Sequence, residues 1–504
     1  MIDLSRRSAG ILMHITSLPG RWGIGDLGPE AYAFADSVAK TGARYWQMLP
    51  LCPTGYGNSP YSGVSTFAGN ELLISPDLLV KDGLLDRGDI GDVPSFPETH
   101  VDYSAVQKWK LPILHKAAVA ALSDSGFRKR LDEFRNENSF WIEDYAVFRT
   151  LEQRYNDARW YSIWPKNEGM HEPKVIAQVL REQHDQVEIW QALQLIFNDQ
   201  CMALKRHCAS KGILTIGDIP IFVGMDSADA WARPELFKRD AQGHFSSVSG
   251  VPPDVFSATG QLWGTPVYDW QYHQKTGFKW WTERIRRCLK LNDVLRIDHF
   301  RGFDAYYDIP AGSETAEHGT WTHVPGKEFF NVLRRNLGEL AIIAEDLGNV
   351  NQAVIDLRKS NGFPGMKIAQ FGFHFLEDGS FDDPERFLPE HYEQSFVAYT
   401  GTHDNNTTRG WFNSLDDVQR KSVLSYLHTD EDNVVCALVK LVMDSCACMT
   451  VIQMQDILGL DGWARMNYPS SCNDTNWSWR MKASEFDEKH ISWFRNLIVT
   501  TARN

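Results

Sequence analysis

The stretch "VLRIDHFRGF", residues 294–303, begins as an apolar strand and ends in a cluster of charged side chains. Arg296, Asp298, His299 and Arg301 stand where a purely structural strand would continue with apolar residues. Burying charge in this way costs free energy unless the groups are paired or take part in chemistry. The stretch therefore predicts a buried strand with functional side chains at its C-terminal end.

Seven further apolar runs end in polar residues in the same way, and most are followed by a helix-like stretch. They are residues 10–18, 45–51, 213–223, 340–348, 365–373, 395–405 and 449–458. Apolar strands that alternate with helices are typical of a parallel sheet, and eight of them predict a (β/α)8 TIM barrel of the α/β class. A doubly wound open sheet is the alternative, which is disfavoured because no glycine-rich phosphate loop follows the first run.

The spacing of the runs is uneven, since about 160 residues separate the second from the third, more than one crossover helix requires. We therefore expect a single domain over residues 1–504 with an inserted subdomain at 52–212. Helical periodicity in 111–134 and 187–210 predicts that the insertion is largely helical. Residues 247–264 are poor in charge and rich in Gly, Pro and aromatics, which indicates a lid loop, with an ordinary ordered loop as the alternative.

Composition limits the partners of the chain. The formal net charge is −14 and the Lys and Arg residues are scattered, so we expect no nucleic acid partner. No apolar stretch approaches the roughly 20 residues of a membrane helix, and "MIDLSRRSAG" lacks a signal-peptide core, so we expect no membrane partner and a cytoplasmic location. The eight cysteines have no C-x-x-C spacing and are expected to be reduced packing thiols.

The strand at 294–303 carries a matched pair of charges. Arg296 and Asp298 are separated by one residue, so both side chains point to the same side of the strand. A guanidinium in this place keeps the carboxylate ionised, as a nucleophile requires. A buried ion pair that only joins the barrel strands is the alternative.

Two other strand ends supply further carboxyl groups. "AIIAEDLG" ends in Glu345 and Asp346, and "TGTHDNNT" ends in His403 and Asp404. The C-terminal ends of barrel strands open onto one face, so three carboxyl groups are expected to meet there. Two carboxyl groups about 5 Å apart are the catalytic pair of retaining glycoside chemistry, and a third can bind substrate hydroxyls. Periodicity does not decide between Glu345 and Asp346, which face opposite ways; the other is expected to be a structural partner.

A metal site is the main rival interpretation of these residues. His299, His403, Asp404 and Asp218 could bind zinc at a barrel mouth. The histidines are single, no H-x-H pair occurs in the first strand, and Arg296 and Arg301 would repel a cation. We therefore expect no metal and no other cofactor.

Five strings resemble one enzyme family, the amylomaltases or 4-α-glucanotransferases (disproportionating enzymes). They are "NSPYSGVSTFAGN", "GVPPDVFSATGQLWG", "RIDHFRG", "AEDLG" and "GTHDNNT", in family order, and the resemblance runs from residue 8 to about 480. It implies an α-amylase-like barrel that has no C-terminal β-domain and needs no metal.

The resemblance also implies roles for individual residues. Asp298 matches the nucleophile, Glu345 the acid/base and Asp404 the carboxylate that stabilises the transition state. The matches to sugar-binding or positioning residues are Tyr61, Asp218, Gln261, Trp263, Arg296, Phe371 and His403, with a weaker match of Tyr56 and Tyr103 to a remote glucan site.

The segment "NYPSSCNDTNWSWR" is similar to the family's pattern N-x-P-G-T…N-W-x-W-R. Asn467, which is implied to contact substrate, is kept, as are Asn476 and Trp477, but Ser470 replaces the family's glycine. Serine tolerates a positive φ poorly, so the resemblance does not by itself carry the local turn and its sugar contact over to this chain.

The resemblance implies transfer of α-1,4-glucan (maltooligosaccharide) segments to the 4-hydroxyl of an acceptor glucan or glucose through a covalent glucosyl enzyme. Starch or glycogen chains would be the macromolecular partners. An α-1,4-glucan hydrolase has the same carboxylates and remains an alternative. A catalytically silent glycan-binding barrel is the non-enzyme alternative, which would be expected to lack one of the three carboxylates.

Overall fold

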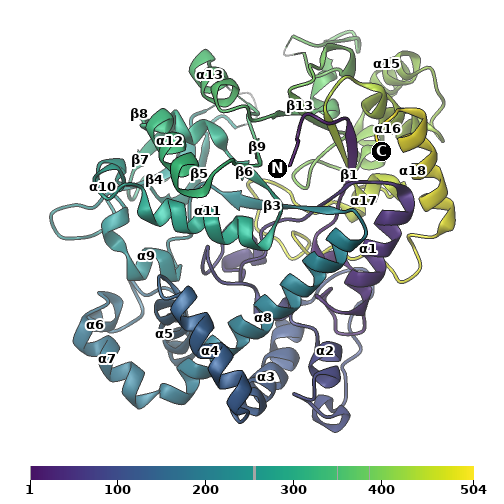
Figure 1. Ribbon diagram of the computed structural model, residues 1–504. Helices are drawn as coiled ribbons and strands as arrows, with labels where there is room; N and C mark the ends of the chain where they lie inside the picture. The colour runs from purple at the N-terminus through teal and green to yellow at the C-terminus, as the bar shows by residue number, and fades with distance from the viewer. Residues whose placement is uncertain (1, 254–256, 349, 385) are drawn as a thin grey trace.

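The computed structural model describes residues 2–253, 257–348, 350–384 and 386–504. Its centre is an eight-stranded parallel sheet (Figure 1). The strands are β1 (Ser8–Leu12), β2 (Tyr45–Gln47), β3 (Leu214–Pro220), β6 (Val294–Asp298), β9 (Ile342–Ala344), β10 (Gly365–Ile368), β13 (Phe396–Tyr399) and β14 (Met449–Gln453). Seven of the eight predicted runs contain one of these strands and the run 10–18 overlaps β1, so the predicted strands and the α/β class are confirmed.

The strands are arranged around a ring in the order in which they occur in the chain. Neighbouring strands are paired in the order β10-β13-β14-β1-β2-β3-β6-β9. The two ends of this series meet where Ala344 N–H, in β9, donates to the carbonyl of Pro364, just before β10, at 2.9 Å. This closed order of parallel strands is that of the (β/α)8 barrel, and it excludes the doubly wound open sheet.

Helices occur in most of the connections between strands, and two more follow the last strand, β14. They are α1 (Pro29–Thr41), α8 (His184–Ser210), α10 (Trp270–Lys275), α11 (Lys279–Leu291), α12 (Gly326–Leu337), α13 (Gln352–Ser360), α14 (Thr408–Ser414), α15 (Asp417–Leu427), α16 (Val434–Asp444), α17 (Met454–Ile457) and α18 (Glu488–Thr500). Between β10 and β13 the described residues instead form a short hairpin, β11 (His374–Phe375) and β12 (Phe381–Asp382).

The stretch 52–212, between β2 and β3, is made largely of helices that lie together at one side of the barrel (Figure 1). They are α2 (Pro76–Lys81), α3 (Tyr103–Leu122), α4 (Ser125–Glu137), α5 (Ile142–Tyr155), α6 (Lys166–Gly169) and α7 (Pro173–Glu182), followed by α8. Helix α8 packs against α3, α4 and α5 and also against α1 and β3. The insertion and the barrel therefore share one buried core, to which Leu114, Phe197 and Ile11 all belong.

Part of the stretch expected to be a lid, 247–264, forms strands rather than an irregular loop. β4 (Ser247–Val251) and β5 (Gln261–Pro266) pair antiparallel with each other, and β4 also pairs with β7 (Ala305–Pro310). With β8 (Thr320–His323) they make a four-stranded sheet in the order β5-β4-β7-β8. Residues 254–256 of the expected lid lie outside the described residues. The short helix α9 (Ala228–Ala232) lies between β3 and this sheet in the chain.

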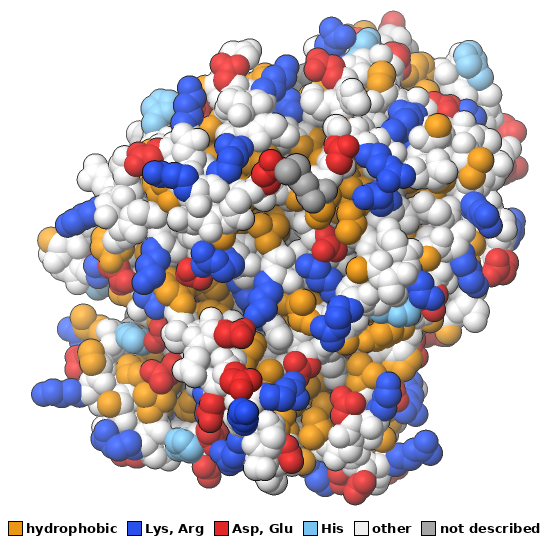
Figure 2. Space-filling view, viewed as in Figure 1, with side chains coloured by type: hydrophobic (Ala, Val, Ile, Leu, Met, Phe, Trp, Pro, Cys, Tyr) orange, Lys and Arg blue, Asp and Glu red, His pale blue; other side chains and the backbone are white. Residues whose placement is uncertain are grey.

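Acidic and basic side chains are interspersed over the face of the molecule drawn in Figure 2. This face therefore does not present the continuous basic surface that a nucleic acid would require. Across the described ranges, helices long and apolar enough to span a membrane are lacking.

Candidate active site

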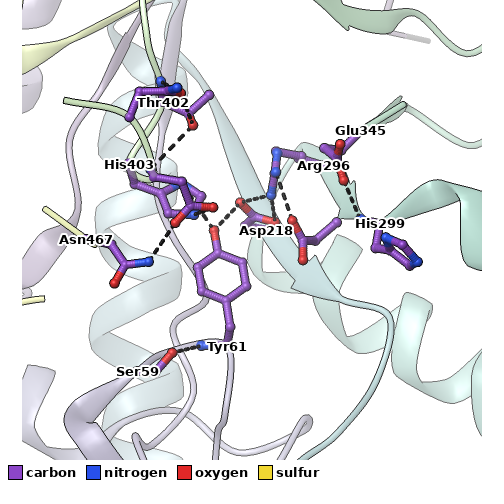
Figure 3. A network of polar contacts seen from close by, with 12 residues as sticks. Ser59, Tyr61, Asp218, Arg296, His299, Glu345, Thr402, His403 and Asn467 are labelled. Atoms are coloured by element: carbon purple, nitrogen blue, oxygen red, sulfur yellow. Dashed lines mark hydrogen bonds and ion pairs between the residues drawn. The ribbon is translucent and has the colours of Figure 1, made fainter. Parts of the chain in front are cut away.

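Side chains from the C-terminal ends of four barrel strands meet around one mouth (Figure 3). Asp218 lies on β3, and Arg296 and Asp298 lie on β6. Glu345 follows β9 directly, while His403 and Asp404 follow β13. The sequence prediction that charged strand ends converge on one face of the barrel agrees with this geometry.

Arg296 holds two carboxylates at once. Its Nη1 lies 2.8 Å from both carboxylate oxygens of Asp218, and its Nη2 donates to Oδ1 of Asp298 at 2.9 Å (Figure 3). Burial alone would lower the pKa of Arg296, but the charges of Asp218 and Asp298 raise it well above its usual value. A permanently charged guanidinium thus fixes the position of Asp298, whose side chain is 29% exposed and open to a substrate.

Tyr61, in the loop after β2, contacts Asp218. Its hydroxyl donates to Oδ2 of Asp218 at 2.9 Å, and its ring stacks on the imidazole of His403 at 4.9 Å between centroids. Burial and the charge of Asp218 raise the pKa of Tyr61 well above its usual value, so the phenol keeps its proton. Trp477 packs against both rings, which holds Tyr61 as a flat apolar surface beside the carboxylates.

Glu345, rather than its neighbour Asp346, points into the site. Its two carboxyl oxygens accept backbone N–H groups, Oε2 from His299 at 2.7 Å and Oε1 from Leu347 at 2.8 Å. Burial, followed by the charge of Asp298, raises the pKa of Glu345 to about 7, against the opposing effects of Arg296 and the two N–H groups. A carboxyl group with this pKa can both give and take a proton near neutral pH.

Asp346 faces away from the site and makes structural contacts. Its Oδ2 pairs with Nε of Arg358 at 2.8 Å, and its Oδ1 accepts the backbone N–H of Met366 at 2.8 Å. The sequence left open which of Glu345 and Asp346 faces the site. The choice is decided by Arg358 on helix α13, which pairs with Asp346 on the side of the strand away from the site.

Asp404 is held by residues from the C-terminal part of the chain. Asn467 Nδ2 donates to Oδ1 of Asp404 at 2.7 Å, and His403 Nε2 lies 3.4 Å from Oδ2. Arg465 binds the backbone carbonyls of both Asp404 and Asn467, each at 2.7 Å. Arg465 could not be predicted as a site residue, because an isolated Arg in a sequence carries no signal of which distant carbonyls it will bind. The side chain of Asp404 is 46% exposed, so it remains accessible.

Two exposed aromatic rings lie on elements beside the mouth. Trp263 on β5 is 38% exposed, and its indole N–H donates to Oε1 of Gln261 at 3.2 Å. Phe371, in the turn after β10, is 42% exposed and packs edge-to-face on Phe387. Exposed flat rings of this kind suit the apolar faces of sugars.

Tyr56 and Tyr103 are not brought onto one surface. Tyr56 is 80% exposed, whereas the ring of Tyr103 is buried among apolar residues and its hydroxyl donates to the carbonyl of Trp477 at 2.9 Å. Tyr103 therefore supports the segment around Trp477 rather than offering a face to a ligand.

Ser470, which replaces the family's glycine, has a φ of 60°. Serine thus takes the left-handed conformation that glycine adopts without strain. The side chain of Asn476 holds the turn by accepting Tyr468 N–H at 3.0 Å and donating to the carbonyl of Ser471 at 2.9 Å. The turn is built with serine in the glycine position.

Two of the four residues that could bind zinc make other contacts. Asp218 is bound by Arg296 and Tyr61, and His403 is stacked on Tyr61. Across residues 2–253, 257–348, 350–384 and 386–504, we found no group of three or more His, Cys, Asp or Glu side chains arranged to hold a metal ion.

The chain is similar to a group of known proteins over almost its whole length. A family model described as 4-alpha-glucanotransferase matches residues 13–485. The 4-alpha-glucanotransferase of Streptococcus pneumoniae is 44% identical over 482 residues, which cover 95% of this chain and 94% of that protein. The chloroplastic/amyloplastic 4-alpha-glucanotransferase of Solanum tuberosum is 42% identical, covering 99% of this chain and 87% of that one.

The fold is similar to that of a solved enzyme. The structure of amylomaltase from Streptococcus agalactiae in complex with acarbose matches with a TM-score of 0.94 at 35% sequence identity, covering 99% of this chain and 100% of that chain. The range matched by the family model includes every residue of the site described above.

Proposed function

This chain belongs to the 4-alpha-glucanotransferase family, and on that premise we propose that it transfers segments of α-1,4-glucans to the 4-hydroxyl of an acceptor glucan or glucose. The observation that carries the proposal is the meeting of Asp298, Glu345 and Asp404 at one barrel mouth, with Arg296 bound to Asp298. Two carboxyl groups at one mouth, of which Glu345 has a pKa raised by burial, suit a retaining double displacement.

The first step forms a covalent intermediate. An oxygen of Asp298 attacks the anomeric carbon of the donor glucan while the bond to the leaving O4 breaks. Glu345, protonated in part near neutral pH, gives its proton to that oxygen. The leaving glucan departs with a free 4-hydroxyl, and the donor remains attached to Asp298.

The second step reverses the first with a new partner. The acceptor's 4-hydroxyl gives its proton to Glu345 and its oxygen attacks the anomeric carbon, which breaks the bond to Asp298. Two inversions return the α configuration. The identical steps with water would give hydrolysis.

The remaining groups position the reacting sugar. Asp404, oriented by Asn467, accepts hydrogen bonds from sugar hydroxyls as positive charge develops at the anomeric carbon. Tyr61 provides the stacking surface for this sugar, and Asp218 and His403 fix that ring. Trp263, Gln261 and Phe371 lie on neighbouring elements, where they hold the flanking sugars and favour an acceptor glucan over water.

We further propose that residues 1–504 act as one catalytic unit, with 52–212 as a helical subdomain and 247–264 as a lid over the site. The shared core of insertion and barrel supports the first part. A cytoplasmic location is proposed from the eight free thiols, a state that a reducing compartment maintains.

Incubation of the purified protein with maltotriose alone tests the proposal. Transfer converts maltotriose into glucose together with a ladder of longer maltooligosaccharides, which chromatography resolves. Glucose and maltose without longer products would identify a hydrolase. No products at all would identify a glycan-binding barrel.

A further inference from the structure

His299, the residue directly after Asp298, has an unusual backbone conformation. Its φ and ψ are 53° and 51°, in the left-handed region that a non-glycine residue enters only at a cost. Such a conformation persists where neighbouring contacts over-determine it, and both halves of His299 make contacts that matter to the site.

The backbone half of His299 holds Glu345. Its N–H donates to Oε2 of Glu345 at 2.7 Å, and the N–H of the next residue, Phe300, donates to the Glu345 carbonyl at 3.0 Å. The left-handed turn therefore directs two successive peptide N–H groups at one residue. Together with Leu347 N–H on Oε1, this fixes the plane of the carboxyl group.

The side-chain half of His299 contacts Trp263. The two rings meet edge-to-face, with centroids 4.9 Å apart and planes at 89°. The Nε2 atom of the imidazole is buried and has no hydrogen-bond partner in the described part of the chain. Burial lowers the pKa of His299 to about 4 against the opposing charge of Asp298, with a smaller contribution from Arg301, so the ring is neutral at neutral pH. A neutral ring whose buried Nε2 has no partner among the described residues acts here as a packing surface for Trp263.

We propose that His299 is a positioning residue that couples the proton-transferring carboxyl of Glu345 to the acceptor platform of Trp263. The inference rests on the proposed glucan transfer and adds to it a physical link between proton transfer and acceptor choice. One residue sets both geometries, since its backbone orients Glu345 and its ring supports Trp263.

Two substitutions separate the effect of the His299 ring from that of its backbone conformation. His299→Gly keeps the left-handed backbone and removes only the ring. We expect the ratio of hydrolysis to transfer to rise by roughly two- to tenfold, the factor that one aromatic contact represents, with an unchanged pH profile. His299→Val removes the ring and also disfavours the left-handed turn because its Cβ is branched.

For His299→Val we expect, besides the changed ratio, a kcat reduced by roughly tenfold or more and a basic limb of the pH profile moved to higher pH. The second shift follows because losing a donated N–H raises the pKa of a carboxyl group. Asp298 and Arg296, the charged side chains that act on Glu345, are unchanged in both variants. His299→Asn, which tolerates the left-handed turn, should restore the pH profile but not the ratio.

His428 is a matched control. It is also a histidine in the left-handed region, with a φ of 49°, at the end of helix α15. His428→Gly and His428→Val should change stability without moving the ratio or the pH profile. A thermal unfolding curve of each variant shows whether the protein is folded at the temperature of the assay.

The assay is transfer and hydrolysis from maltotriose over a pH series. A wild-type protein that transfers, with His299 variants whose ratio and pH profile stay within error of wild type, overturns the inference and leaves the proposed function standing. If His299→Val does not fold, the Gly and Asn variants decide alone, because an unchanged ratio in both contradicts the link to Trp263. A wild type that does not transfer contradicts the proposed function and this inference with it.

Discussion

The side-chain amide of Asn467 donates a 2.7 Å hydrogen bond to Oδ1 of Asp404, although 63 residues separate the two in the chain. Asp404 follows a barrel strand, whereas Asn467 lies beyond the last strand of the barrel. The segment after β14 therefore completes the site by orienting a carboxylate whose side chain is 46% exposed.

Asn467→Ala should lower kcat/KM by roughly ten- to a hundredfold, because a hydrogen bond to a charged group is worth about 1.5–3 kcal/mol. Initial rates on maltotriose would measure this. Asn413→Ala removes an amide-to-carboxylate bond of 3.0 Å to Asp461 at an exposed place and serves as the matched control. Equal losses in the two variants would mean that Asn467 acts through general stability.

Asp298→Asn should abolish transfer and hydrolysis together, since neither can begin without the nucleophile. Asp293→Asn is the matched control. Asp293 directly precedes strand β6, at the end opposite to Asp298, and pairs with Lys205, so this variant should keep most of the activity. If the Asp298→Asn variant keeps activity within about tenfold of wild type, Asp298 is not the nucleophile.

The barrel could be predicted from the sequence because each strand lies in a largely apolar run, as is typical of a parallel sheet that is covered on both faces. The roles of residues that depend on packing against distant parts of the chain could not be predicted. Glu345 and Asp346 differ in role because Arg358, on a helix further along the chain, pairs with Asp346. Tyr103 is buried because helix α3 packs it against the core, which the sequence around it does not show.

The stretch 247–264 shows the same limit for a whole segment. Its low charge and its glycines and prolines indicate a loop, yet β4 pairs with β5 on one side and with β7 on the other. Strand pairing across a long separation depends on partners that local composition does not reveal. The predicted lid motion remains a prediction.

The activity should fall as the pH rises through about 7, because the first step needs protonated Glu345 and its pKa is about 7. The pH dependence of kcat/KM on maltotriose would measure this. A basic limb near the ordinary carboxyl value of 4.5 would contradict the assigned environment of Glu345.

Stability should show the same titration. The folded protein holds a proton on Glu345 that the unfolded chain releases above pH 4.5. This contribution to stability is full below pH 4.5 and is lost as the pH rises through about 7. Relative to Glu345→Gln, which does not titrate, wild type should lose about 1–3 kcal/mol of unfolding free energy over that range. A constant difference between the two proteins would argue against the raised pKa.

Treatment with EDTA should leave transfer unchanged, because the proposed chemistry uses carboxyl groups and the guanidinium of Arg296 binds both Asp218 and Asp298. Activity before and after dialysis against the chelator would be compared. A loss that added zinc restores would favour the metal interpretation of Asp218, His299, His403 and Asp404.

Trp263→Ala should lower transfer much more than hydrolysis. Deleting an exposed stacking surface costs an acceptor sugar roughly 1 kcal/mol or more, whereas water loses no contact. The ratio of bonds hydrolysed to bonds transferred, counted from maltotriose in one assay, should therefore rise. Trp321 is also 38% exposed and lies on the opposite edge strand of the same sheet, so Trp321→Ala controls for the loss of an exposed indole. If Trp263→Ala reduces both rates equally, the ring holds the donor or packs the sheet, and acceptor selection must lie elsewhere, with Phe371 as the next ring to change.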